Sequence, residues 1–175
     1  MFTIIFPVLN ERLRLESGVT RTVEYLQSIA FEDYEIIIVD NGSEDETPQI
    51  AEKLCKKYDK VRYERINVRG VGAAFRRGVE VSHGDVVGYM DIDLSTNIRH
   101  LGEAIHLFGT QPEIQYINGS RFARESDTRG RKWYRRITSQ GLLILLKLFL
   151  RMKSTDAICG FTFVQIGRAS CRERV

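Results

Sequence analysis

The chain alternates between short, continuously apolar runs and longer segments whose apolar residues recur every three or four positions. The first pattern is typical of buried strands and the second of amphipathic helices. The runs predict strands over 2–9, 34–39, 61–66, 86 onward and 115–119. The helical spacing predicts helices over 17–30, from Pro48 onward with Thr47 as the N-cap, over 73–81 and over 98–108. Because strands alternate with helices, we predict an α/β fold with a mainly parallel, Rossmann-like sheet flanked by helices.

The segment 86–95, VVGYMDIDLS, runs from an apolar strand into two acids, Asp91 and Asp93. Open α/β sheets bind their ligands at the carboxyl ends of strands, which is where these acids fall. In an extended chain, residues two apart point to the same side, so the two carboxylates repel each other unless a cation neutralises them. Mg²⁺ and Mn²⁺ prefer oxygen ligands and substrate phosphates, which makes this pair a candidate metal site. On spacing alone, an ordinary acidic turn is the alternative.

Two other loops follow strands that should end at the same edge, namely Pro7–Glu11 and Asp40–Ser43. Proline brings no N–H to a ladder, so we expect Pro7 to end the hydrogen bonding of the first strand. Acidic and amide groups in these loops suit the N–H and O–H donors of a base and a ribose. With a metal-held diphosphate at the third loop, they predict a nucleotide-diphosphate donor site. Arginines downstream could receive a phosphate, which predicts an anionic acceptor beside the donor.

Length and composition describe one globular domain. The chain has 175 residues, of which 43% are hydrophobic and 28% charged. No apolar stretch reaches the roughly 20 residues of a membrane span, and no signal peptide is visible, which favours the cytoplasm.

The last ten residues, 166–175, break the strand-like pattern with the sequence IGRASCRERV. They match a translated sequencing-adapter end, so we expect a non-native artefact tail after a domain over 1–165 that is incomplete at its C-terminus. Without the tail the net charge falls from +3 to +1. Cys55 and Cys159 then remain, with no metal-ligand spacing between them.

A basic stretch precedes a ten-residue apolar run. Residues 121–136 hold seven basic and two acidic side chains, and GLLILLKLFL follows at 141–150. As a helix this run would be about 15 Å long, too short to cross a bilayer but able to lie on its surface. Packing on the sheet is the alternative. Nucleic acid is disfavoured because only Trp133 and Tyr134 offer stacking here and no binding motif is present.

Five motifs, in order, carry a resemblance to a known family: FPVLNE, IIIVDNGSEDET, GVGAAFRRGVEVSHGDVVGYMDIDLS, INGSRF and DAICGF. Together they resemble the family two glycosyltransferases of the GT-A fold. Within these they are most similar to the branch that transfers mannose or glucose to dolichyl or polyprenyl phosphate. Each motif alone is weak, but the set, in this order and at these distances, is specific over residues 1–165.

The resemblance implies three groups of site residues. The donor would be bound by Pro7, Asn10, Glu11, Asp40, Asn41, Gly70 and Asp91. Asp91 and Asp93 would hold Mg²⁺ or Mn²⁺, and Arg121, Arg135 and Ser139 would grip the acceptor phosphate. Asp93, Arg121 and Arg135 would be the catalytic residues.

Some positions differ from the family pattern or match one branch of the family better than another. Asn41 stands where many members have a second Asp, which leaves the base open. Ser95 stands where the mannosyl branch often has Gln, which weakens the mannose assignment. Asp156 and Cys159-Gly160-Phe161 resemble a segment near the acceptor pocket, and this cysteine is more like the glucosyl branch.

The activity implied is inverting transfer of a hexose from GDP-mannose or UDP-glucose to a polyprenyl or dolichyl phosphate. The enzyme would be peripheral at the cytoplasmic face of the membrane, and its oligomeric state is left open. A phosphate with a second pKa of about 6 is already ionised, so it needs positioning by arginines rather than a general base. The alternatives are a saccharide acceptor, with Asp156 as a possible base, and a nucleotide-sugar binding module without catalysis.

Overall fold

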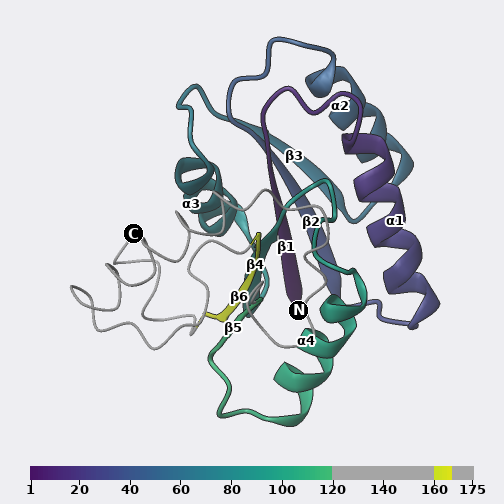
Figure 1. Ribbon diagram of the computed structural model, residues 1–175, viewed down its shortest axis with the longest axis vertical. Coiled ribbons are helices and arrows are strands. Elements are labelled where there is room, and N and C mark those ends of the chain that lie inside the picture. Colours follow the sequence, from purple (N-terminus) through teal and green to yellow (C-terminus); the bar gives the residue numbers. More distant parts are fainter. Residues whose placement is uncertain (120–159, 167–175) are drawn as a thin grey trace, which may run out of the picture. The chain divides into compact units, whose positions relative to one another are not determined.

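The computed structural model of the chain describes residues 1–119 and 160–166 (Figure 1). Its sheet has the strand order β3-β2-β1-β4-β6-β5. The strands are β1 (Phe2–Val8), β2 (Tyr34–Asp40), β3 (Val61–Arg65), β4 (Val86–Met90), β5 (Tyr116–Asn118) and β6 (Phe161–Gln165). The helices are α1 (Leu15–Ser28), α2 (Thr47–Lys57), α3 (Val71–Val81) and α4 (Arg99–Thr110). The apolar run 141–150 lies outside the described residues.

The predicted α/β fold is confirmed, and the predicted element ends agree with the observed ones to within two residues. β3, β2, β1 and β4 are parallel neighbours, which makes the sheet mainly parallel. β6 departs from this pattern because it pairs with β4 in the antiparallel direction, from Met90↔Phe161 to Val86↔Gln165. The short charged strand β3 is an edge strand of the sheet.

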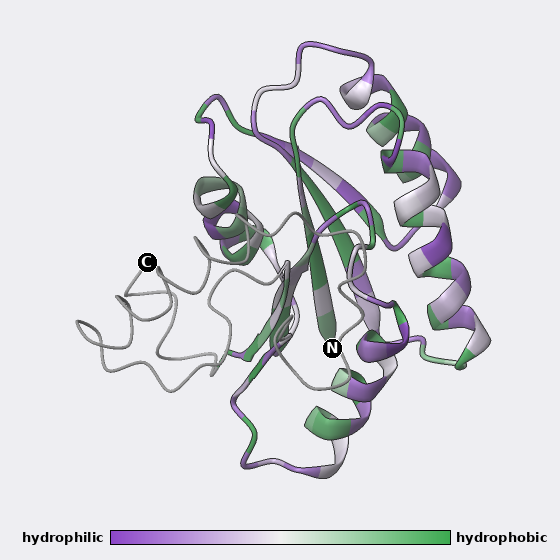
Figure 2. Cartoon of the chain, in the orientation of Figure 1, coloured by the Kyte–Doolittle hydropathy of each residue, from purple (hydrophilic) through white to green (hydrophobic). Residues whose placement is uncertain are grey.

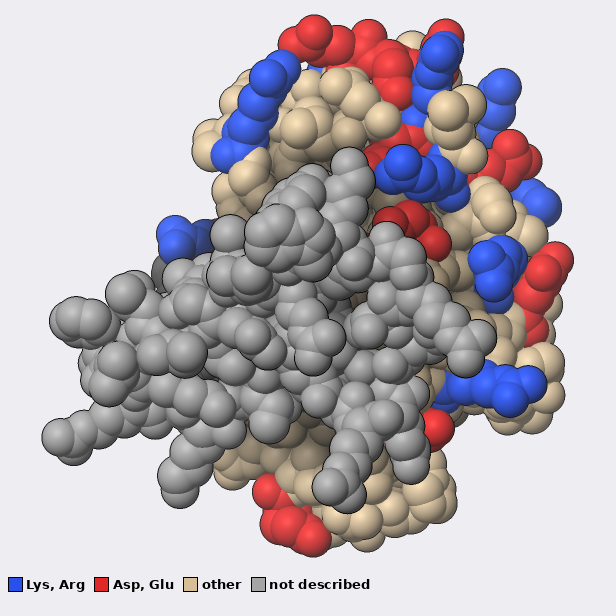
Figure 3. All heavy atoms as spheres, viewed as in Figure 1, with Lys and Arg blue, Asp and Glu red and all other residues tan. Residues whose placement is uncertain are grey.

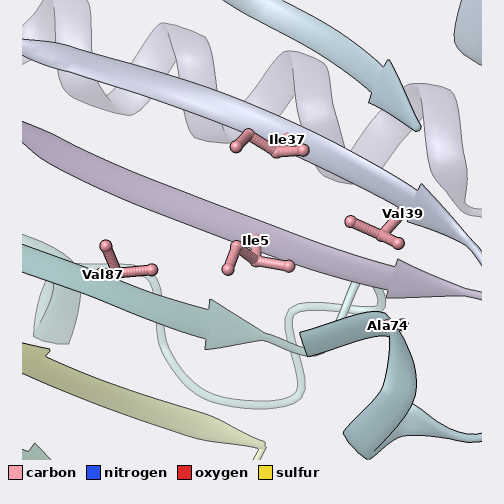
Figure 4. Close-up of a cluster of buried hydrophobic side chains, with 5 residues drawn as sticks. All are labelled: Ile5, Ile37, Val39, Ala74 and Val87. Carbon is pink, nitrogen blue, oxygen red and sulfur yellow. The ribbon is translucent and has the colours of Figure 1, made fainter. Parts of the chain in front are cut away.

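Helices cover both faces of the sheet, with α3 on one face and α1 and α2 on the other (Figure 1). The central strands are almost wholly hydrophobic, whereas the helices alternate hydrophobic and hydrophilic surfaces (Figure 2). Under α3, one cluster joins Ala74 of the helix to Ile5, Ile37, Val39 and Val87 of the strands (Figure 4). Each of the isoleucine and valine side chains in this cluster contributes roughly 1.5–3 kcal/mol when fully buried.

An aromatic cluster fills part of the other face. The ring of Phe2 lies 6.0 Å from Phe31, 5.8 Å from Phe108 on α4 and 5.4 Å from Phe163 on β6, between ring centroids. These separations fall in the range at which aromatic pairs attract. The cluster therefore ties β6 and α4 to the start of β1.

The prediction that Pro7 ends the hydrogen bonding of the first strand is wrong. β1 continues to Val8, whose carbonyl accepts from the Asn41 N–H at 3.0 Å. Successive residues of a strand direct their N–H groups to opposite neighbours, so Pro7 faces β4 rather than β2. On that side the pairing has already stopped at Ile5↔Tyr89, and no ladder bond is lost.

The order of the strands creates a switch point between β1 and β4. From β1 the chain moves outward to β2 and β3, and then returns across the sheet to place β4 on the other side of β1. Ligands of open α/β sheets bind at the carboxyl ends of strands where the order reverses in this way. The segments 9–14 and 91–95 leave the sheet at this point.

A polar cluster lies at the amino-terminal ends of the parallel strands, opposite the switch point. It surrounds the buried carboxylate of Glu35. Glu35 accepts hydrogen bonds from the Thr3 hydroxyl at 2.7 Å, the His83 N–H at 2.6 Å and Arg62 at 3.1 Å. Burial acts to raise the pKa of Glu35, but these hydrogen bonds outweigh it and lower the pKa from its ordinary value. The cluster fixes the turn before β4 to the first two strands.

Within residues 1–119 and 160–166, none of the helices has the length and apolar character needed to cross a membrane.

We predict that Glu35→Gln lowers the free energy of unfolding by about 1–3 kcal/mol at pH 7, because buried donors lose their charged acceptor. The native pKa of Glu35 is lowered, so its contribution is present above the unfolded pKa and disappears as the pH falls through the native value. The unfolding free energies of wild type and variant should therefore stay apart above the unfolded pKa of about 4 and approach each other as the pH falls below it. Glu52→Gln, at an exposed position on α2, is the control and should change little. A constant difference between Glu35→Gln and wild type from pH 7 to pH 3 would contradict this.

Candidate active site

The turn after β2 is built around the carboxylate of Asp40, which is fully buried. One oxygen accepts from the N–H groups of Gly42 at 3.1 Å and Ser43 at 2.7 Å. The other accepts from the Tyr63 hydroxyl at 2.9 Å. A carboxylate offers about four acceptor positions, and protein donors occupy three of them here. Asp40 therefore shapes the turn, with capacity for about one more donor.

Two side chains of β3 hold Asp40 and were missed by the sequence analysis. Tyr63 donates to the carboxylate, while Arg65 lies 3.9 Å from it and donates to the Ser43 carbonyl at 3.0 Å. Burial, followed by the hydrogen bond to Asp40, raises the pKa of Tyr63 to about 12. Tyr63 and Arg65 are two residues apart, so they lie on the same side of β3, and Arg65 pairs with Asp40 on β2. This spacing is the sequence signal that could have identified them.

The loops after β1 and β2 leave the same edge of the sheet, as predicted, and hydrogen bonds join them. The Asn10 N–H donates to Ser43 Oγ at 2.8 Å, and Asn10 Oδ1 accepts from the Glu44 N–H at 2.9 Å. Asn10 has φ 56°, a left-handed conformation that asparagine tolerates better than most residues. The Glu11 N–H donates to Thr47 Oγ1 at 2.8 Å. Thr47 was expected to precede its helix as the N-cap, but it is the first residue of α2 and its hydroxyl serves this loop instead.

Asn41 is buried directly beside the end of β1, with 3% of its surface exposed. Its side-chain oxygen accepts no hydrogen bond from the described part of the chain. A buried acceptor without a donor costs about 1–3 kcal/mol, so native proteins rarely leave one unexplained. This oxygen has acceptor capacity that a donor group at the sheet edge could use.

Asp91 and Asp93 follow β4 in a turn, so the extended chain assumed for them is wrong. The Leu94 N–H donates to the Asp91 carbonyl at 3.0 Å, and Leu94 has φ 51°. Both acids are exposed, whereas Ile92 between them is 4% exposed. Asp93 Oδ1 accepts from the Ser95 N–H at 2.9 Å, which fixes the orientation of that carboxylate. The turn presents two acids to solvent while its middle residue anchors it.

The glycine loop before α3 also lies at this edge. Gly70 has φ 139°, a conformation that other residues adopt only with strain. A Cβ added at Gly70 would meet nothing within 4 Å, so the space above the backbone is open. The Arg69 guanidinium forms an ion pair with Glu44 at 2.8 Å between Nη2 and Oε1. This pair joins the glycine loop to the loop after β2. Figure 3 shows basic and acidic side chains intermixed along this upper rim.

The predicted acceptor residues lie outside the described part of the chain. These are Arg121, Arg135, Ser139, Asp156 and Cys159. Phe161, the last residue of the predicted acceptor segment, is 2% exposed and packs 5.0 Å from Phe163 between ring centroids. It pairs with Met90, the residue before Asp91, so its role here is structural.

The donor set after β4 suits a hard divalent cation. Among the described residues no group of three His, Cys, Asp or Glu side chains could hold a metal ion. Asp91 and Asp93 offer oxygen ligands from two residues only. Mg²⁺ is commonly bound by one or two carboxylates together with waters and substrate phosphates, so these residues fit it.

Comparison with known proteins identifies the family. The family model described as Glycosyl transferase family 2 matches residues 3–171. The chain belongs to glycosyl transferase family 2.

Relatives of this family 2 chain include enzymes named for dolichyl phosphate. Glycosyltransferase AglD of Haloferax volcanii is 37% identical over 163 residues, 91% of this chain and 26% of AglD. Dolichyl-phosphate beta-glucosyltransferase of Mus musculus is 33% identical over 171 residues, 91% of this chain and 53% of that protein. Dolichol-phosphate mannosyltransferase of Pyrococcus furiosus is 30% identical over 148 residues, 85% of this chain and 41% of that protein. This chain therefore spans between a quarter and about half the length of these curated relatives.

Solved structures confirm the GT-A fold that the motifs of this family 2 chain predicted. Mannosyl-3-phosphoglycerate synthase from Rubrobacter xylanophilus superposes with a TM-score of 0.70, at 19% identity over 94% of this chain and 53% of that one. Glucosyl-3-phosphoglycerate synthase from Mycobacterium tuberculosis with bound UDP has a TM-score of 0.67, at 21% identity over 94% and 56%. At these identities the likeness shows the fold alone.

We predict that Tyr63→Phe lowers the free energy of unfolding by about 1.5–3 kcal/mol at pH 8, because Asp40 loses a donor to its charge. The native pKa of Tyr63 is raised, so this contribution is present below the unfolded value near 10 and is lost as the pH rises toward 12. Denaturant unfolding at pH 8 and pH 11 measures both effects. Tyr116→Phe, at a tyrosine that is 54% exposed, is the matched control. Equal stability of wild type and Tyr63→Phe at pH 8 would contradict the role of this hydrogen bond.

Proposed function

We propose that this chain is the donor-binding part of an inverting glycosyltransferase. It moves a hexose from a nucleotide-diphosphate sugar to a polyprenyl or dolichyl phosphate at the cytoplasmic face of the membrane. The observation that carries the proposal is the convergence of the loops after β1, β2 and β4 at one edge of the sheet. This edge combines the hydrogen-bonded turn around Asp40 with two exposed acids at the switch point.

The base and ribose would lie against the loops after β1 and β2. Asn10, Glu11, Asp40 and Asn41 would supply acceptors there, with Pro7 beside them, and the backbone at Gly70 is open. Cross-loop hydrogen bonds hold this end before the donor arrives, so little conformational freedom is lost on binding. The side-chain oxygen of Asn41, which has no donor within residues 1–119 and 160–166, supports a ligand with N–H groups at this end.

The diphosphate would lie toward β4. Asp91 and Asp93 would hold Mg²⁺ or Mn²⁺ there, which offsets negative charge on the leaving diphosphate when bound. The parallel strand spacing separates the backbones of Asp40 and Asp91 by about 10 Å, two strand intervals. The donor would thus extend across the end of β1.

The acceptor assignment is supported by the names of the relatives and by the basic residues in the chain. The curated relatives include a dolichyl-phosphate beta-glucosyltransferase and a dolichol-phosphate mannosyltransferase. Arg121, Arg135 and Ser139 would position the acceptor phosphate, whose charge makes a general base unnecessary.

The reaction is one displacement at the anomeric carbon. A phosphate oxygen of the acceptor forms a bond to that carbon as the bond to the diphosphate oxygen breaks. The electron pair leaves with the nucleoside diphosphate, and the configuration at the carbon inverts. No covalent enzyme intermediate is required.

We predict that Asp93→Ala reduces metal-dependent sugar transfer to a short polyprenyl phosphate by about 100-fold or more in the intact protein, because a metal ligand is lost. Radiolabelled UDP-glucose and GDP-mannose, tested separately, measure transfer and identify the donor. Asp59→Ala, at an exposed acid between α2 and β3, is the control and should keep wild-type activity. Unchanged transfer by Asp93→Ala would overturn the metal role.

Arg135→Ala separates the two acceptor classes. If the acceptor is a lipid phosphate, the KM for polyprenyl phosphate should rise at least tenfold while the KM for the donor stays near wild type. Transfer that is unaffected by this substitution, or that proceeds only to a saccharide, would contradict the lipid acceptor.

A further inference from the structure

The turn that carries Asp91 and Asp93 packs unusually closely against α1. Ile92 is 4% exposed, although its two neighbours are exposed. A Cβ built on Gly18 of α1 would lie 2.3 Å from the Ile92 carbonyl oxygen and 2.8 Å from its Cδ1. Real Cβ atoms do not approach other atoms this closely, so only glycine fits at position 18 with the turn where it is.

The contact falls on the peptide bond between Ile92 and Asp93. The Ile92 carbonyl belongs to the peptide that leads into Asp93, so displacing this oxygen rotates the backbone from which the Asp93 carboxylate extends. The turn has little freedom to absorb such a rotation. It is closed by the hydrogen bond from Leu94 to Asp91, and Leu94 already has φ 51°, which is rare for a bulky side chain.

The helix side of the contact is also fixed. The Gly18 N–H donates to the Arg14 carbonyl at 2.8 Å, and the Gly18 carbonyl accepts from the Thr22 hydroxyl at 2.9 Å. Glycine is the poorest helix former after proline, so an ordinary position in the first turns of a helix favours alanine. Its presence here is explained by the close approach of the turn rather than by the helix.

We propose that Gly18 is a positioning residue for the metal-binding carboxylates. The missing side chain lets the Ile92 peptide lie against α1, and this contact sets where Asp91 and Asp93 present their oxygens. The inference rests on the proposed metal role of these two acids and adds a residue of α1 that touches neither metal nor donor.

The test is the Mn²⁺ affinity of the full chain in the presence of UDP and, in a second series, GDP. Loss of the electron paramagnetic resonance signal of free Mn²⁺ measures it. Gly18→Ala should weaken Mn²⁺ binding at least tenfold. Its affinity for the same nucleotide without metal, set by the loops after β1 and β2, should stay within twofold of wild type. Gly109→Ala is the matched control, because it makes the same change in α4 at an exposed site where a Cβ meets nothing within 4 Å.

Two outcomes would overturn the inference. The first is Mn²⁺ binding by Gly18→Ala within twofold of wild type. The second is an equal loss of Mn²⁺ and metal-free nucleotide affinity, which would indicate general damage rather than positioning. If Gly18→Ala does not fold, Ile92→Val provides the test, because it removes only the Cδ1 methyl that lies beside Gly18. A threefold or greater loss of Mn²⁺ affinity then supports the inference, and a smaller change overturns it.

Asp93→Ala distinguishes failure of this inference from failure of the proposed function. If Asp93→Ala binds Mn²⁺ like wild type, the metal site itself is wrong. If Asp93→Ala loses Mn²⁺ while Gly18→Ala retains it, the metal site stands and the positioning role falls.

Discussion

The parallel pairing of β1 with both β2 and β4 is the constraint on which the site depends. It places Val8 beside Asp40 on one side and Ile5 beside Tyr89 on the other, so the strands end together. The chain reaches this arrangement by crossing the sheet between β3 and β4, and the crossing creates the switch point. Polar loops that are distant in sequence thereby leave the sheet at one edge. The buried aliphatic residues under α3 hold the three strands in this register.

Different forces fix the two ends of the edge. Near β2, a network of hydrogen bonds holds the loops: Tyr63 holds Asp40, Ser43 accepts from Asn10, and Thr47 accepts from Glu11. Near β4, packing dominates, because Ile92 anchors a turn whose acids are exposed. The first end is therefore pre-organised for directional contacts, as the base and ribose of the proposed donor would require. The second end presents charge to solvent, where a cation and a diphosphate can meet it.

Much of this arrangement could be predicted from the sequence, because apolar runs and helical spacing report burial directly. They predicted the elements other than β6, the mainly parallel sheet and the convergence of the loops after β1, β2 and β4. Side-chain roles that depend on tertiary contacts could not be read in this way. Thr47 has the sequence context of an N-cap, yet its hydroxyl accepts from Glu11 across two loops. Gly18 looks like a weak point in a helix until the turn at Ile92 is seen against it.

The most direct test of the account is paramagnetic broadening by Mn²⁺ in amide NMR spectra of the chain with bound nucleoside diphosphate. The central claim is that one sheet edge gathers cation and donor. Broadening should then be strongest for amides of residues 91–95, next for residues 9–11 and 41–43, and absent around His83 at the opposite edge. Broadening centred on His83, or spread without preference over exposed acids such as Asp59, would contradict the account.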